Sequence, residues 1–140
     1  MKQTTLISTI FLCLLGAATL NIALQAIANP QAIMDNVQVT LGNITARNSI
    51  RALYGGVNLA FGLFWLFSAF KARREGLLLA LLYTGGFAAG RLMSIALDGP
   101  PEAFARQWLV VESVFAVGAA TLLVLHSRLK PAMLAVSNKF

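Results

Sequence analysis

The sequence has little of what a disulfide framework, a histidine metal site or a charged soluble surface requires. Cys13 is the only cysteine and His126 the only histidine. No disulfide can form within the chain, and a metal site would lack its usual set of matched ligands. Only 11% of the residues are charged, whereas 58% are hydrophobic. We therefore expect no metal and no other cofactor, and no familiar catalytic motif is present.

The hydrophobic residues fall into four long runs separated by short polar stretches. Each run is close to the roughly 20 residues needed to cross a hydrocarbon core of about 30 Å. The pattern predicts an all-α fold, a bundle of four transmembrane helices that forms one integral membrane domain over residues 1–140. The predicted helices cover residues 6–28, 49–70, 76–97 and 102–128.

The first hydrophobic run has a second interpretation. Lys2, the apolar stretch 6–15 and the Ala-Ile-Ala triplet at 26–28 resemble a signal peptide with its cleavage site. The apolar character continues past the usual signal core, which favours a membrane helix. Whether residues 1–28 are removed stays open.

Basic residues are unevenly distributed among the loops, and short loops rich in Lys and Arg stay in the cytoplasm during membrane insertion. Four crossings would bring seven of them to one side: Lys2, Lys71, Arg73, Arg74, Arg128, Lys130 and Lys139. We therefore predict a multi-pass membrane protein with both termini cytoplasmic. The net charge of +6 follows from this topology, so we expect anionic membrane lipid, and not nucleic acid, to face the basic loops.

The long outer loop, residues 29–47, contains a helix signal. Asn29 followed by Pro30 matches a helix N-cap with proline in the first position. Ile33, Met34 and Val37 would then share one face. We expect a short helix along the membrane surface between the first two transmembrane helices.

Two charged residues stand inside apolar runs. Arg91 lies six residues before the end of the third run, and Glu112 lies five residues after the start of the fourth. At about 1.5 Å per residue, both lie some 7–9 Å below the same edge of the membrane core. Such a residue costs about 2.5–3.5 kcal/mol even on the lenient insertion scale and usually pairs inside the bundle. The sequence therefore predicts an Arg91–Glu112 ion pair.

Further polar residues at helical spacing predict an ionic cluster around this pair, in the outer half of the bundle. An Arg51–Asp98 pair would make the cluster neutral and closed, with a structural role. If Asp98 instead points to water, the excess positive charge would attract an anionic headgroup or a carboxylate. Gly86 and Gly90 are expected to permit close helix approach nearby. The predicted cluster comprises Asn48, Arg51, Tyr54, Arg91, Ser94, Asp98 and Glu112.

Aromatic residues are expected to have ordinary roles. A stripe near the cytoplasmic end of the second helix is typical of interface anchors that face lipid or a neighbouring protein. Tyr83 and Trp108 need no special function. The stripe consists of Phe61, Phe64, Trp65, Phe67 and Phe70.

Two stretches carry a family resemblance: NSIRALYGGVNLAFGLF at 48–64 and GRLMSIALDGPP at 90–101. They are similar to the signatures of an uncharacterised bacterial family of four-helix integral membrane proteins, domain of unknown function 4345. The family pattern is Asn-x-x-Arg-x-x-Tyr-Gly-Gly, then Gly-Arg-x-x-Ser-x-x-x-Asp-Gly, then an acidic residue early in the fourth helix. These positions include all seven residues of the predicted cluster. The resemblance, over roughly residues 6–128, implies the four-helix membrane fold and a location in a bacterial inner membrane, but it brings no established chemistry.

Three functions from different classes suit this sequence. An accessory or assembly subunit of a larger membrane complex is favoured, because a polar layer in a small membrane protein can fix a single packing arrangement of its helices. Its partner would be another membrane protein or a second copy of the chain. A module that binds or transports a small molecule or a lipid headgroup is the alternative. An intramembrane enzyme is least favoured, because it would need Glu112 as acid or base and a carboxylate beside arginines is poorly suited to that role.

Overall fold

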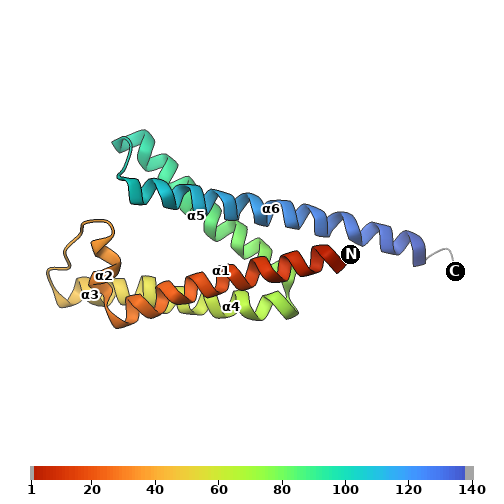
Figure 1. Cartoon of the computed structure of the whole chain (residues 1–140), viewed down its shortest axis with the longest axis horizontal. Coiled ribbons are helices and arrows are strands. Elements are labelled where there is room, and N and C mark those ends of the chain that lie inside the picture. Colours follow the sequence, from red (N-terminus) through yellow and green to blue (C-terminus); the bar gives the residue numbers. More distant parts are fainter. Residues whose placement is uncertain (1, 138–140) are drawn as a thin grey trace.

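The fold is entirely helical over the part of the chain that the structure describes. The computed structural model describes residues 2–137, with side chains over residues 3–127. No strand occurs in this range, so the predicted all-α class is confirmed (Figure 1). The elements are α1 (Lys2–Ala28), α2 (Pro30–Asp35), α3 (Ile44–Ile50), η1 (Arg51–Val57), α4 (Asn58–Lys71), α5 (Arg73–Asp98) and α6 (Ala103–Ser137).

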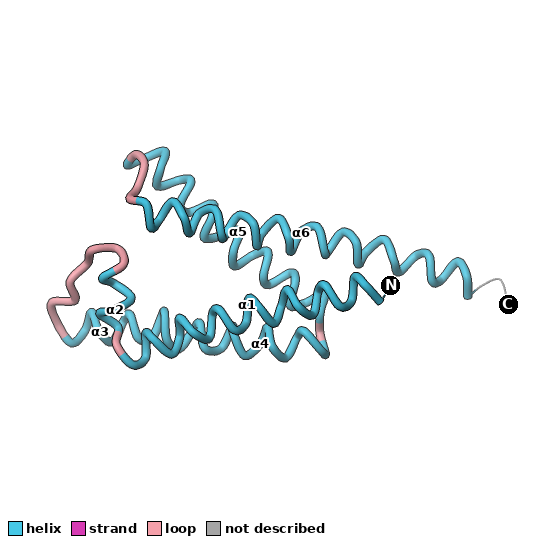
Figure 2. The backbone as a smooth tube through the Cα atoms, viewed as in Figure 1, coloured by secondary structure: helices cyan, strands magenta, loops and turns pink. Residues whose placement is uncertain are grey.

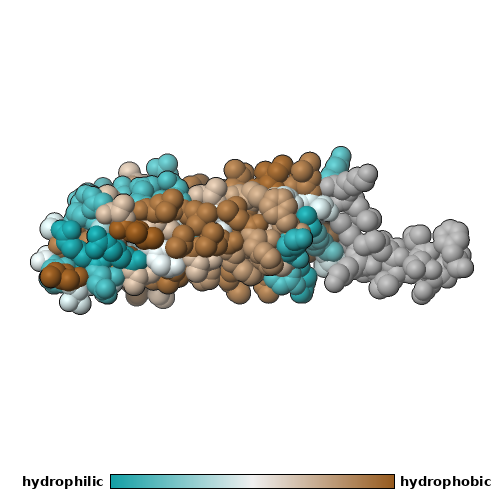
Figure 3. All heavy atoms as spheres, turned by 90° about the horizontal axis from the view of Figure 1, so that it is seen from below, coloured by the Kyte–Doolittle hydropathy of each residue, from teal (hydrophilic) through white to brown (hydrophobic). Residues whose placement is uncertain are grey.

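Four helical stretches are long and apolar enough to cross a membrane. This is the pattern of a multi-pass membrane protein, and it confirms the four predicted spans. Hydrophobic side chains cover the middle of the face drawn in Figure 3, and hydrophilic ones gather towards its two ends. The stretches are Gln3–Ala28, Ile44–Lys71, Arg73–Asp98 and Ala103–Ser127.

The connections lie at the helix ends (Figure 2). As predicted, a short helix, α2, lies between the first two spans, and the Asn29 side chain caps it by accepting a hydrogen bond from the Gln31 N–H at 3.2 Å. The second span begins earlier than predicted, at residue 44 instead of 49. The reason is Asn43, whose side chain accepts from the Ala46 N–H at 2.8 Å and so caps α3.

The last helix also exceeds its prediction, since α6 continues to Ser137 instead of ending at residue 128. In the picture, the start of α1, the α4–α5 turn and the C-terminal part of α6 lie toward one end of the molecule (Figure 1). We call this the N-terminal end, and the opposite end, with α2 and the α5–α6 turn, the α2 end. The side chains of Lys2, Arg128, Lys130 and Lys139, used to predict orientation, lie outside the described residues.

The helices pack as two antiparallel pairs. One pair is α1 with the continuous stretch α3–η1–α4, and the other is α5 with α6 (Figure 1). Glycines bring α1 and α4 close together, because a Cβ atom on Gly62 would lie 2.7 Å from the Leu20 Cγ and one on Gly16 would lie 3.0 Å from the Gly62 carbonyl oxygen. Small residues commonly mark such close membrane-helix contacts.

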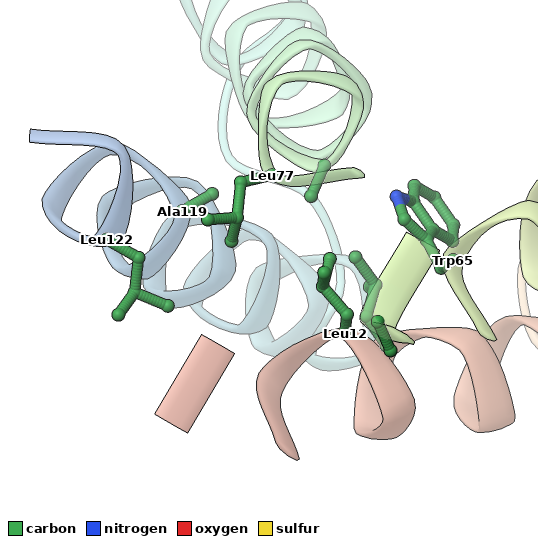
Figure 4. Packing of buried hydrophobic residues seen from close by; sticks show 8 residues of the cluster. Leu12, Trp65, Leu77, Ala119 and Leu122 are labelled. Carbon is green, nitrogen blue, oxygen red and sulfur yellow. The ribbon is translucent and has the colours of Figure 1, made fainter. Parts of the chain in front are cut away.

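The two pairs meet at the N-terminal end. A hydrophobic core there takes side chains from all four long helices, including Leu12, Trp65, Leu77 and Leu122 (Figure 4). The expectation that Trp65 faces lipid or a neighbouring protein is wrong, because its side chain is completely buried within the chain and its Nε1 donates to the Gly76 carbonyl at 3.2 Å. The turn between α4 and α5 places this acceptor within the core, which satisfies the indole N–H.

Polar bonds reinforce the same end. The Ser8 hydroxyl lies 3.2 Å from the His126 Nε2 and so links α1 to α6. The Arg73 Nε donates to the Thr9 hydroxyl at 3.0 Å, which links α5 to α1. Toward the α2 end the two helix pairs lie apart (Figure 1).

Candidate functional site: a groove between the helix pairs

An open groove lies between the two pairs, in the half of the molecule toward the α2 end. Its cavity volume is about 580 Å³, within the range of about 300–1,000 Å³ that small-molecule sites occupy. One wall is η1, which contributes Tyr54, and the other is α5. The α5 wall consists of Tyr83, Gly86, Phe87, Gly90, Arg91 and Ser94.

The α5 wall follows from helical spacing. Its residues recur at intervals of three and four positions and therefore form one stripe along the helix. The predicted close approach at Gly86 and Gly90 is wrong, since a Cβ atom on either would meet nothing within 4 Å. These two glycines leave space in the wall and deepen the groove.

The opposite wall is carried by an unusual helix. Residues Arg51–Val57 form a π-helix, η1, a conformation that is rare in proteins and occurs frequently at functional sites. This segment contains the Arg, Tyr and both Gly residues of the first family signature. Gly55 is buried against α1, where an added Cβ would lie 2.8 Å from the Ile27 Cγ1, while its neighbour Tyr54 lines the groove.

Tyr83 connects the groove to the core. Its hydroxyl donates to the buried Asn58 Oδ1 at 2.6 Å, which joins α5 to α4. Its ring makes edge contacts with Phe61, Trp65 and Phe87, with centroid distances of 5.3, 5.0 and 5.0 Å. The sequence analysis missed this residue, although its position eight residues before Arg91 places it on the same helix face.

The predicted ion pair is confirmed. The Arg91 Nε and Nη2 donate to the two carboxylate oxygens of Glu112 at 2.7 and 3.0 Å, in a bidentate geometry. The Glu112 side chain is 10% exposed, whereas that of Arg91 is 28% exposed. The carboxylate is therefore buried between α5 and α6, and the guanidinium group is the partner that reaches the groove.

The rest of the predicted cluster is divided among separate places. Asp98 is exposed and accepts a hydrogen bond from the Ser94 hydroxyl at 3.1 Å. The Arg51 Nε donates to the Ile27 carbonyl at 3.1 Å, in the last turn of α1. Asn48 is exposed on α3, one turn before Arg51. The structure thus joins Arg91 to Glu112 and Ser94 to Asp98, and it brings Tyr54 to the groove.

The Arg51–Asp98 pair is not formed, for a physical reason. The last carbonyls of a helix have no partner within it and carry its negative dipole end, so a cation there is favourable. Arg51 takes this position on α1. Among the residues with described side chains, Arg91–Glu112 is the only ion pair, so the charged group at the groove is neutral as a unit.

The fold and the groove define a multi-pass helical membrane protein with an open groove between two helix pairs. The chain belongs to the family described as "Domain of unknown function (DUF4345)", whose family model matches residues 7–124. The resemblance found in the sequence is therefore confirmed. No curated protein and no solved structure matches the chain.

Proposed function

We propose that the protein is a membrane binding module that holds the polar head of an amphiphilic molecule in the groove between the helix pairs. The observation that carries this proposal is the partial exposure of the paired Arg91 side chain in a groove whose other lining, apart from Ser94, is aromatic or glycine. Ligand sites typically combine an apolar lining with a few fixed polar groups.

The groove supports binding more than a closed structural cluster. A purely structural ion pair would be covered on all sides, yet the Arg91 side chain stays partly exposed while Glu112 behind it does not. The groove also lies among helices apolar enough to span a membrane, so a ligand can enter sideways from the lipid. Both oxygens of Glu112 are engaged by Arg91, which favours binding over acid or base catalysis.

Filling the groove tests this proposal. Gly90→Leu places a side chain where a Cβ meets no neighbour within 4 Å, so the variant should fold and occupy the ligand's space. We expect the wild-type protein, extracted in mild detergent, to retain an amphiphile detectable by mass spectrometry, and Gly90→Leu to lose most of it. Ala89→Leu, at an adjacent exposed position outside the groove, is the matched control and should retain it. Equal retention in all three proteins would refute the proposal.

An accessory or assembly subunit is the second candidate, and one surface favours it. Along α6, exposed β-branched residues alternate at spacings of four and three, as in a coiled-coil seam. The valine side chains are nearly fixed in one rotamer on a helix and lose little entropy when they pack. This matters in lipid, where helix association depends on packing. The seam consists of Val110, Val114, Val117, Thr121 and Val124.

Disulfide cross-linking in native membranes tests the subunit function. In a Cys13→Ala background, Val117→Cys should cross-link to a second copy or to another protein. Leu92→Cys, which is also exposed but lies on α5, should not. Absence of any product at position 117 would remove the support that the seam gives. For both functions we place the protein in a bacterial inner membrane with its termini in the cytoplasm.

A further inference from the structure

We infer that the ligand of the groove is a neutral acyl ester, whose carbonyl oxygens accept hydrogen bonds from Arg91. This inference rests on the proposed binding function and names the chemistry of the head. It departs from the anionic ligand that the sequence predicted for an outward Asp98. Three observations carry it: the Arg91 charge is already compensated by Glu112, hydrogen-bond donors of Arg91 remain free, and the lining of the groove is mainly aromatic or glycine.

The charge of Arg91 is already compensated. Glu112 takes two of its N–H groups through both carboxylate oxygens. An anionic head would place a second negative charge on one guanidinium group, in surroundings of low dielectric where like charges repel strongly. Arg51 does not offset this charge in the structure, because it is not part of the groove lining and its Nε is bonded to the Ile27 carbonyl of α1. A neutral head avoids the repulsion.

The groove offers hydrogen-bond donors. Arginine has five N–H groups and no acceptor, so three remain after the two bonds to Glu112. One is on Nη2 and two are on Nη1, and the Nη2–H forms a second fork with one of the two on Nη1. No buried side-chain nitrogen or oxygen lacks a partner among the described residues, so Nη1 is accessible. In contrast, the hydroxyls of Ser94 and Tyr83 donate to Asp98 and Asn58.

An unpaired N–H surrounded by lipid is costly, so the head should supply acceptors without a negative charge. The carbonyl oxygen of an ester meets this requirement. The Tyr54 hydroxyl on the opposite wall can donate to the same head. Tyr83 and Phe87, which precede Arg91 on α5, present aromatic surface to the groove. Gly86 and Gly90 leave room there for an acyl chain.

The test compares two probes with the same chain. Methyl oleate and oleate are titrated separately into the full-length protein in detergent, at alkaline pH where oleate is ionised, and bound molecules are counted by native mass spectrometry. We expect the wild-type protein to bind the ester at least about tenfold more tightly than the carboxylate. Gly90→Leu should abolish the specific binding, whereas Ala89→Leu should leave it unchanged.

Glu112→Gln gives the opposite expectation. The amide keeps the shape and one acceptor oxygen of Glu112 but removes its charge, so Arg91 should now prefer oleate over the ester. Tighter binding of oleate to the wild type, sensitive to Gly90→Leu, would overturn the neutral head and leave the binding function intact. Binding of both probes that Gly90→Leu does not change would instead refute the groove as a site. The wild-type comparison remains decisive even if the Glu112 variant fails to fold.

Discussion

The two ends of this molecule are built differently from the same four spans. At the N-terminal end, large side chains from different helices meet, as Phe11 of α1 does with Phe115 of α6 at a centroid distance of 5.3 Å. Toward the α2 end, the α5 stripe instead contains two glycines and an arginine whose partner is within its own pair. The last described hydrogen bond between the pairs before the groove is Tyr83 to Asn58.

This contrast separates stability from binding. The closed end holds the pairs together through buried leucines and Trp65, so substitutions there should mainly change the free energy of unfolding. The open end lacks this packing, so the proposed ligand would enter there without displacing core residues. The Arg91–Glu112 pair is expected to affect both stability and binding, because Glu112 is buried and Arg91 is partly exposed.

The largest expected effect concerns which end faces the cytoplasm. In a Cys13→Ala background, a cysteine at Gln38, in the exposed loop at the α2 end, should react with an impermeant thiol reagent in intact cells. A cysteine at Lys139, beyond the described residues, should react only after the cells are permeabilised. Labelling of position 139 alone in intact cells would reverse the predicted orientation.

The ion pair should give the largest loss of stability. Arg91→Ala should lower the free energy of unfolding in detergent by about 3–5 kcal/mol, because the Glu112 charge is left buried without compensation. Glu112→Ala should lower it by less, because the Arg91 side chain that remains is partly exposed. The double variant should recover part of the loss. Denaturation curves of the three variants measure this, and strictly additive losses would show that the two residues do not act as a pair.

The closed end should be sensitive to the loss of a core side chain. Leu12→Ala removes a completely buried side chain, so we expect a loss of about 2–5 kcal/mol, as for other buried leucines. Leu14→Ala, on the same helix but 60% exposed, should change stability much less, since its side chain meets lipid. Similar losses in the two variants would contradict the position assigned to the core.

The smallest effects should have opposite signs at two glycines. Gly62→Ala places a Cβ 2.7 Å from the Leu20 side chain, and such overpacking costs about 1–3 kcal/mol. Gly86→Ala meets nothing within 4 Å and should raise stability by up to about 1 kcal/mol through helix propensity. Thermal unfolding of both variants distinguishes the tightly packed α1–α4 contact from the open groove, and destabilisation by Gly86→Ala would argue that the groove is closed.

The four spans, the short helix after Asn29 and the Arg91–Glu112 pair could be predicted from the sequence alone. Each follows from one-dimensional information: the length of an apolar run, the preference of a capping residue, or the depth of a charge along its helix. An unpaired charge in lipid is costly, so Arg91 was expected to pair with an oppositely charged residue at the same depth, and Glu112 meets this requirement. Helix ends were less exact, because the Asn43 cap extended the second span by five residues beyond the prediction.

Which apolar faces meet each other and which meet lipid depends on the packing of the helices in three dimensions. A membrane helix is hydrophobic on both kinds of face, so hydropathy does not distinguish a buried Trp65 from an exposed Phe67. A glycine is similarly ambiguous, since it permits close contact at Gly62 and leaves open space at Gly90. The π-helix that carries Tyr54, the bond of Arg51 to the α1 carbonyl and the groove itself depend on how two helix pairs pack in three dimensions, which the spacing of residues along one helix does not specify.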